Sequence, residues 1–347
     1  MKNFSEISLL KFIFVILGLI GCLTIYSAYS DAGGELSPFA TKQFLWLIFA
    51  IIFMQFFSIL RFSQLCFFNP LFSIISLVLL LLVLLFGENI NGMRGWFKFG
   101  EFMFQPSEFV KPFFILALTN TIGRKRELIL SLCLSFAFVS LLILEPDYGG
   151  ALIYLFIVFV FFYLRTDRIY KFFFSILGFS VIFIFLILKK TYIVKRFLAF
   201  VDPFIDPYGA GWHSLQFKYT IARGGLFGSG WGNCLWANSY LPLPHSDSSF
   251  ATLAEASGLL GTMPLMFFFS ILPYIAIHFA NKQRNLENAI FILLAFSAIS
   301  FQAFVHIMVN LGLFPATGLT LPLISYGGSS LISTFISIGM ISSAAKD

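Results

Sequence analysis

The sequence predicts an all-α, polytopic membrane protein with about ten transmembrane helices and one large extracytoplasmic loop between helices 7 and 8. The chain has 347 residues, of which 59% are hydrophobic and only 11% are charged, and its mean hydropathy is +0.92. Soluble domains are about 25% charged, and so few charges could not cover a soluble surface. Apolar segments of about 20 residues, the length that crosses the hydrocarbon of a bilayer, recur along the chain.

Ten apolar segments are long enough to be spans. They cover residues 8–28, 43–60, 68–86, 107–122, 128–145, 149–165, 170–188, 250–279, 287–310 and 321–344. The first is expected to remain uncleaved, because it is too long for a signal peptide and lacks a small-residue cleavage site. The fourth and tenth carry polar or glycine-rich stretches and fit the criterion least well.

Basic residues in the short loops set the expected orientation, since Lys and Arg collect on the cytoplasmic side. Every second loop is basic: Arg61; Arg124, Lys125 and Arg126; Arg165, Arg168 and Lys171; Lys282 and Arg284. Both termini are therefore predicted to be cytoplasmic. The same alternation explains the net charge of +6 without a nucleic-acid partner. We expect residues 1–347 to form one domain, with a loop at about 189–250 outside.

The long polar loop is the segment where chemistry is expected, because the rest of the chain is built for lipid. Residues 191–201 are predicted to form a short interfacial helix. Two Asp-Pro pairs then turn the chain, and a glycine-dense run follows at 224–232. The segment 241–250 contains the string LPHSDSSF, whose Asp247 is the candidate catalytic residue.

Ionisable residues inside predicted spans need an explanation, because each costs about 2.5–3.5 kcal/mol in lipid. Glu108 and Lys111 stand three residues apart and can form an ion pair. A structural pair and a role in an internal cavity are both open. Glu145 and Asp147 close the fifth span in the string EPDYGG, where Asp147 could meet Lys111 or Arg94.

Other polar residues lie around the loop and in the later spans. Glu255 follows Asp247 by eight residues, so both could share a helix face. His245 could bind phosphate or face solvent, and His306 is more typical of a hydrogen-bonded packing residue. No two histidines have the spacing of a zinc site.

The tenth span begins with LPLISYGGSS, which includes Ser325 and Tyr326. Paired small residues let backbones approach closely, or mark a break that lines a cavity. Packing is the favoured interpretation for these residues alone.

Taken together and in this order, seven strings resemble the SEDS family, the shape, elongation, division and sporulation proteins typified by FtsW and RodA. The resemblance covers nearly the whole chain. The strings are NGMRGWFKFG (91–100), QPSEFVK (105–111), EPDYGG (145–150), DPYGAGWHSLQ (206–216), GGLFGSGWGN (224–233), LPHSDSSFATLAE (243–255) and NLGLFPATGLTLPLISYGGSS (310–330).

The resemblance implies a peptidoglycan glycosyltransferase that polymerises lipid II at the outer face of the cytoplasmic membrane, in cell division or elongation. It implies a class B penicillin-binding protein and other divisome or elongasome membrane proteins as partners. The family's catalytic Asp falls on Asp247, and its internal polar residues fall on Glu108, Lys111 and Asp147. The chain departs from the usual pattern at Ser246, Ser248, Ser249, Ala237, Leu243 and Ala256. Arg223 and Gly232-Asn233 slightly favour the FtsW-like branch, and His213 the RodA-like branch.

The implied reaction has clear requirements. Sugar transfer from a lipid diphosphate needs a base for the acceptor hydroxyl and positive charge on the departing diphosphate. Asp247 can be the base, or it can hold a divalent Mg or Mn cation. Arg196, Lys218 and Arg223, with amides of the glycine run, are the candidate diphosphate partners, and His245 and Glu255 are further substrate-binding candidates.

Three other readings remain open at this stage. A lipid II flippase would use the same substrate and the polar residues of the spans, and a non-catalytic scaffold would only recruit a penicillin-binding protein. A secondary transporter is disfavoured because no inverted pair of broken helices is evident.

Overall fold

The computed structural model describes residues 2–29, 37–90, 92–100, 102–165, 191–209 and 211–346. Within these ranges the protein is a helical bundle, with seven helices long and apolar enough to cross a membrane. The prediction of an all-α polytopic membrane protein is confirmed. The seven helices are α1 (Lys2–Tyr29), α2 (Pro38–Ile59), α3 (Phe62–Phe86), α6 (Glu127–Leu144), α7 (Tyr148–Arg165), α12 (Ser249–Ala280) and α13 (Leu286–Asn310).

The predicted fourth span is two short helices, α4 (Pro106–Phe109) and α5 (Lys111–Thr119). Pro112 explains the break, because its ring would clash with the carbonyl four residues earlier and it has no N–H to donate. The pair is nevertheless buried from Pro106 to Thr119, with only Phe109 partly exposed. The predicted seventh span, 170–188, lies outside the described residues.

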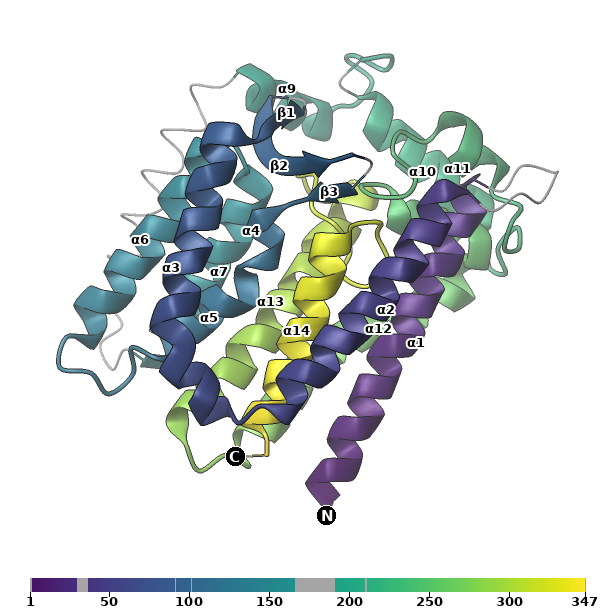
Figure 1. The fold of residues 1–347 in the computed structure, drawn as a ribbon. Coiled ribbons are helices and arrows are strands. Elements are labelled where there is room, and N and C mark those ends of the chain that lie inside the picture. The colour runs from purple at the N-terminus through teal and green to yellow at the C-terminus, as the bar shows by residue number, and fades with distance from the viewer. Residues whose placement is uncertain are drawn as a thin grey trace.

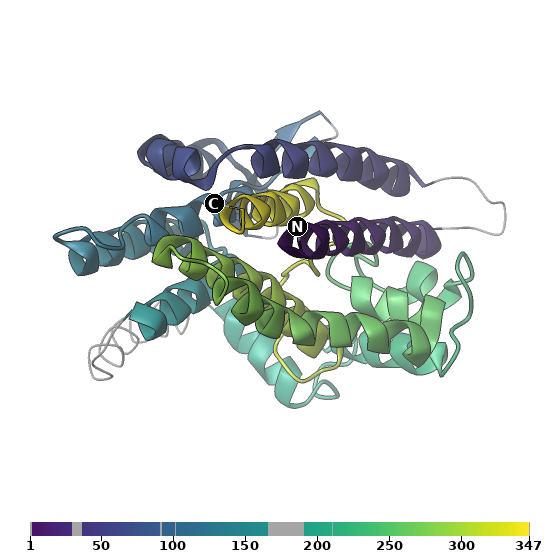
Figure 2. The ribbon, with the colours of Figure 1, turned by 90° about the horizontal axis from the view of Figure 1, so that it is seen from below.

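The last helix, α14 (Gly328–Ala344), occupies the centre of the bundle. Every one of its residues is buried, and it packs against α2 along its length. Seen from below, it lies between α2 on one side and α12 and α13 on the other (Figure 2). A Cβ on Gly339 would come within 2.5 Å of the Met54 carbonyl, so the small residues serve close packing. The helix starts seven residues later than the predicted span, because 321–327 form turns.

A small antiparallel sheet follows α3 and was not predicted. It consists of β1 (Glu88–Ile90), β2 (Met93–Phe99) and β3 (Phe102–Phe104), in the order β1-β2-β3. The expectation that everything outside the long polar loop is apolar helix was therefore wrong for this segment. Glycines at positive φ on either side of β2, Gly92 (85°) and Gly100 (63°), allow the tight turns.

The long polar loop contains three helices. The predicted helix at 191–201 is confirmed as α9 (Thr191–Val201), whereas α10 (Trp212–Gly224) and α11 (Leu235–Tyr240) were not predicted. These helices and the sheet lie at one end of the bundle, and both chain termini lie at the other (Figure 1). This arrangement places the loop's candidate residues over one end of the membrane-spanning bundle.

Candidate functional site

The short segment that carries Asp247 is fixed to the bundle by side chains from α13 and from the turns before α14. Asn310 Nδ2 donates to the Asp247 carbonyl at 3.0 Å, and its Oδ1 accepts the Ala251 N–H at 3.2 Å. Ser325 Oγ donates to the Ser246 carbonyl at 2.9 Å and lies 2.6 Å from Ser249 Oγ. Asp247 therefore occupies a fixed position just before the first turn of α12.

His245 lies in an aromatic cluster beside this segment. Its ring stacks on Phe39 with centroids 4.5 Å apart, it meets the Tyr326 ring edge-on at 5.5 Å, and its Nδ1 contacts the Tyr29 hydroxyl. The Tyr326 N–H donates to the His245 carbonyl at 2.7 Å. Burial lowers the pKa of His245 to about 4, so the ring is neutral near pH 7. The proposed phosphate contact of His245 is thus not favoured by this geometry.

The segment 311–320, which follows α13, is contacted by two cations of the polar loop and by Asp247. Arg196 Nη1 donates to the Ala316 carbonyl at 2.8 Å. A Cβ on Gly318 would lie 3.9 Å from Asp247 Oδ2, and one on Gly312 would lie 2.9 Å from Lys218 Cε. Arg196, Lys218 and Asp247 therefore gather along one ten-residue segment although they come from α9, α10 and the loop before α12.

The charges of Arg196 and Asp247 interact. Burial raises the pKa of Asp247 above its ordinary value, and the positive charge of Arg196 opposes that rise. Burial lowers the pKa of the Arg196 guanidinium, and Asp247 opposes this change in turn. A carboxyl with a raised pKa beside a cation is suited to accept a proton near neutral pH.

Arg223 and Glu255, both predicted to bind substrate, contact each other. Arg223 Nε lies 3.1 Å from Glu255 Oε1. Glu255 is fully buried and also accepts the N–H groups of Trp236 at 3.1 Å and Ala237 at 2.8 Å. The pair attaches α10 and the start of α11 to α12, which is a structural role for both side chains.

The glycine run at 224–232 packs its backbone on α12, and this occupies two of the amides that were expected to be available to a diphosphate. The Ser229 and Gly230 N–H groups donate to the carbonyls of Glu255 and Ala256 at 2.8 and 3.1 Å. A Cβ on Gly224 would lie 1.9 Å from the Ala254 carbonyl oxygen. The glycines are thus required for the close approach of two backbones.

Inside the bundle, Glu108 and Lys111 form the predicted ion pair at 2.6 Å. Lys111 Nζ also donates to Gln302 Oε1 at 2.5 Å, and Gln302 Nε2 donates to the Thr320 carbonyl at 3.0 Å. This network connects α4 and α5 through α13 to the end of the 311–320 segment. Its position fits a structural pair that supports the loop beside Asp247.

Asp147 is buried beside this network but does not bond Lys111 directly. It accepts the Ser107 hydroxyl at 2.7 Å and the Gly150 N–H at 2.8 Å, so it joins the start of α7 to α4. Arg94 lies exposed on β2. Glu145 is fully buried, and its two carboxyl oxygens have no hydrogen-bond partner among the described residues.

Sequence reasoning missed the two amides that hold the site, Asn310 and Gln302. Each is polar within a predicted apolar span and is buried, which is the signal that identified Glu108 and Lys111. The predicted packing role of His306 is confirmed: its Nδ1 lies 2.6 Å from the Leu319 carbonyl oxygen and its Nε2 lies 3.3 Å from Ser249 Oγ.

A profile of the FtsW/RodA/SpoVE family of cell cycle proteins matches residues 7–347. The chain belongs to this family. It is 33% identical to the probable peptidoglycan glycosyltransferase FtsW of Wigglesworthia glossinidia brevipalpis, over 98% of this chain and 93% of that protein. It is 32% identical to stage V sporulation protein E of Bacillus subtilis, over 99% of this chain and 98% of that protein.

Solved structures of family members have the same fold. One is a chain from a structure of a peptidoglycan synthase complex, solved to explain how the complex coordinates polymerization and crosslinking. It aligns with a TM-score of 0.79 at 29% identity, over 99% of this chain and 97% of its own. The rod shape determining protein RodA of Thermus thermophilus aligns with a TM-score of 0.71 at 28% identity, over 97% of this chain and 95% of its own. The resemblance seen in the sequence is confirmed by these comparisons.

Proposed function

We propose that this protein is a peptidoglycan glycosyltransferase that polymerises lipid II at the outer face of the bacterial cytoplasmic membrane. The observation that carries the proposal is the arrangement of Arg196, Lys218 and Asp247 along the 311–320 segment. This combination supplies one carboxylate and two cations over one end of a membrane-spanning bundle. Curated relatives named as probable peptidoglycan glycosyltransferases support the same activity.

In the proposed reaction Asp247 acts as the general base. It removes the proton of the acceptor sugar hydroxyl, whose oxygen bonds to the anomeric carbon of the donor as the bond from that carbon to the diphosphate oxygen breaks. A single displacement of this kind inverts the anomeric centre. The raised pKa of Asp247 brings its proton affinity closer to that needed near neutral pH.

Arg196 and Lys218 are the proposed partners of the departing lipid diphosphate. Arg196 carries a fixed positive charge next to Asp247, and its planar guanidinium suits phosphate oxygens. Lys218 is exposed and can extend toward the same region from α10. Cations on the diphosphate stabilise the negative charge that develops as it leaves.

A divalent cation is compatible with this site. The described residues contain no group of three His, Cys, Asp or Glu side chains that could hold a metal on their own. Mg²⁺ usually takes only one or two carboxylates and completes its shell with water and substrate phosphates. Asp247 would be the protein ligand, and the cation would supply further positive charge to the diphosphate.

The proposal includes an orientation and a partner. The basic loops favour cytoplasmic termini, and the end of the bundle that carries α9, α10 and α11, which lies opposite the termini (Figure 1), would then face outward. We propose a class B penicillin-binding protein as the partner. The similar chain from a peptidoglycan synthase complex supports this choice.

Polymerisation from labelled lipid II by the purified protein tests the proposed function. Wild type, with its penicillin-binding protein and Mg²⁺ or Mn²⁺, is expected to give glycan ladders, and Asp247→Ala none. In a parallel vesicle assay, transport of labelled lipid II without glycan growth would instead establish a flippase. Neither ladders nor transport from a folded, partner-bound protein would indicate a scaffold.

A further inference from the structure

His306 of α13 lies between two segments of the proposed active site. One is the turn that carries Asp247 and enters α12 at Ser249, and the other is the 311–320 segment, to which Arg196 bonds. The His306 ring is buried, with 1% of its surface exposed. An apolar side chain would fill the same space in a membrane-spanning helix at lower cost, so packing alone does not explain a histidine here.

Both nitrogens of the His306 ring have a partner, one in each segment. Nδ1 lies 2.6 Å from the Leu319 carbonyl oxygen, which can only accept, so Nδ1 carries a proton. Nε2 lies 3.3 Å from Ser249 Oγ, and in the neutral ring Nε2 accepts the proton of this hydroxyl. One side chain therefore links the 311–320 segment to a residue two positions after Asp247.

Leu319 is the fixed point of the 311–320 segment. It is 5% exposed, whereas the rest of the segment is partly or fully exposed. Its side chain also packs on the start of α7, where a Cβ on Gly149 would lie 3.1 Å from Leu319 Cγ. Ala316, whose carbonyl accepts from Arg196, lies three residues earlier. A shift of Leu319 would therefore move the group that Arg196 bonds.

The other end of the link is held by buried hydroxyls. Ser249 is 0% exposed, and its Oγ lies 2.6 Å from Ser325 Oγ. Ser325 Oγ in turn bonds the Ser246 carbonyl at 2.9 Å. The link from His306 thus ends on the first turn of α12, in a network that includes the residue directly before Asp247.

The separation of Asp247 and Arg196 matters for the proposed reaction. Their charges interact, and this interaction weakens with distance. The two side chains also have to act on the same bond, one as the base and the other on the departing diphosphate. Misplacement of a catalytic group by about 1 Å can lower a rate by about 10²-fold.

We propose that His306 is a positioning residue of the glycosyltransferase, which sets the separation of Asp247 and Arg196 by bonding both segments. His306 acts through these two side chains and does not touch the reacting atoms. The inference rests on the proposed function, because the separation matters only if Asp247 and Arg196 act on one bond.

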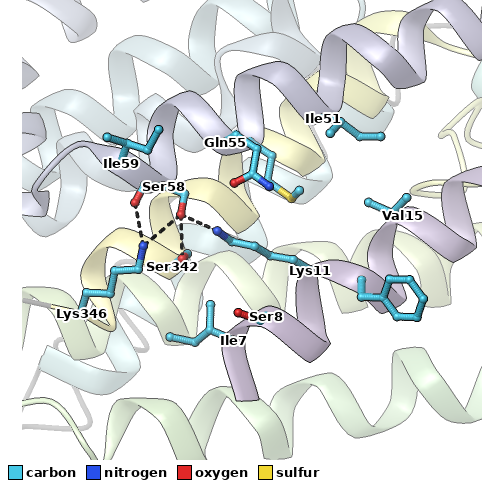
Figure 3. Close-up of a pocket in the computed structure, with 12 residues that line it drawn as sticks. Ile7, Ser8, Lys11, Val15, Ile51, Gln55, Ser58, Ile59, Ser342 and Lys346 are labelled. Carbon is cyan, nitrogen blue, oxygen red and sulfur yellow. Dashed lines mark hydrogen bonds between the residues drawn. The ribbon is translucent and has the colours of Figure 1, made fainter. Parts of the chain in front are cut away.

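Polymerisation rates from labelled lipid II test the link at both ends. His306→Leu can neither donate nor accept and should lower the rate by about 10²-fold, and His306→Gln, whose amide does both, should recover part of it. Ser249→Ala cuts the link while the Leu319 carbonyl stays bonded, and should lower the rate by about tenfold. The matched control is Ser342→Ala, which removes a hydroxyl that is also 0% exposed and lies 2.9 Å from Ser58 Oγ near the end of α14 (Figure 3). Its rate should equal that of wild type.

A double-mutant cycle separates positioning from a general loss of folded protein. Arg196→Gln is expected to slow wild type by about 10²-fold. If His306 acts through Arg196, the double variant with His306→Leu should be little slower than Arg196→Gln alone. A merely structural role predicts additive losses of about 10⁴-fold for the double variant.

Amide hydrogen exchange gives a readout that does not depend on catalysis. Exchange in the 311–320 segment should be at least about tenfold faster in His306→Leu than in wild type, because local opening exposes the amides. It should be unchanged in Ser342→Ala. If His306→Leu does not fold, Ser249→Ala takes its place in the cycle and in the exchange measurement.

Two results would overturn the proposal: additive losses in the cycle, or wild-type exchange in the 311–320 segment when the link is cut. Failure of the proposed function gives a different result. Wild type would then form no glycan, while faster exchange in His306→Leu would still establish the link between the two segments.

Discussion

Truncation of Glu255 to alanine should strongly destabilise the protein, because its carboxylate is buried and accepts three donors. Two are the backbone N–H groups of Trp236 and Ala237 at 3.1 and 2.8 Å, and the third is Arg223. Arg223 is 45% exposed and can turn to water, so it contributes little to the loss. Each unsatisfied amide costs about 1–3 kcal/mol, which predicts a loss of about 2–6 kcal/mol in the free energy of unfolding.

The assay is unfolding of the purified protein in detergent, followed by tryptophan fluorescence, which reports on Trp236 beside the ion pair. The matched control is Glu88→Ala, which removes a surface ion pair with Lys98 at 3.8 Å, where both side chains are about half exposed. That change is expected to cost at most about 1 kcal/mol. If Glu255→Ala unfolds at the same midpoint as Glu88→Ala, the structural role assigned to Glu255 is wrong.

Three further changes test other parts of the account. Replacement of Arg196 by Gln should lower the polymerisation rate by about 10²-fold, as loss of one transition-state partner does. Arg196→Lys should recover part of the lost rate. An unchanged rate for Arg196→Gln would show that this residue does not take part in the reaction. Stability should fall as the pH drops from about 6.5 toward 4, because the folded-state pKa of His245, about 4, lies below its ordinary value of 6.5 and the unfolded chain therefore binds the proton more readily. When the free energy of unfolding is measured at each pH, His245→Asn should show a smaller decrease over this range. A pH dependence identical to that of wild type would contradict the assignment. Glu145→Gln should change the free energy of unfolding by less than about 1 kcal/mol, because its carboxyl oxygens have no hydrogen-bond partner among the described residues. Glu108→Gln breaks a buried ion pair and should lower the free energy of unfolding by about 3 kcal/mol. Equal losses would indicate that Glu145 is ionised and paired.

Patterns of hydropathy and charge predicted most of the bundle, because lipid restricts what can cross it. The short α5 and the start of α14 were predicted less well. In both, tertiary packing replaces length and apolarity: α14 is buried on all sides, so its serines and glycines are never exposed to lipid. The β-strands at 88–104 carry no clear alternation of apolar and polar residues, and this explains why they were missed.

The candidate site was predicted residue by residue but not as an arrangement. Sequence reasoning grouped Arg196, Lys218 and Arg223 as equivalent cations, since each lies in the polar loop. The structure separates them, because Arg223 pairs with Glu255 while the other two lie along the 311–320 segment. No local pattern shows which loop cation faces a segment one hundred residues away.

The most direct test of the central claim is the rate of glycan polymerisation by Asp247→Asn, which keeps the size and most contacts of the side chain but cannot accept the proton as a carboxylate does. Asp202→Asn is the matched control, because Asp202 lies in the same polar loop and its carboxylate accepts the Phe204 N–H of its own turn at 2.9 Å. The account predicts a loss of at least about 10²-fold for Asp247→Asn and a wild-type rate for Asp202→Asn, with both variants unfolding like wild type. A wild-type rate from Asp247→Asn would contradict the assignment of Asp247 as the base.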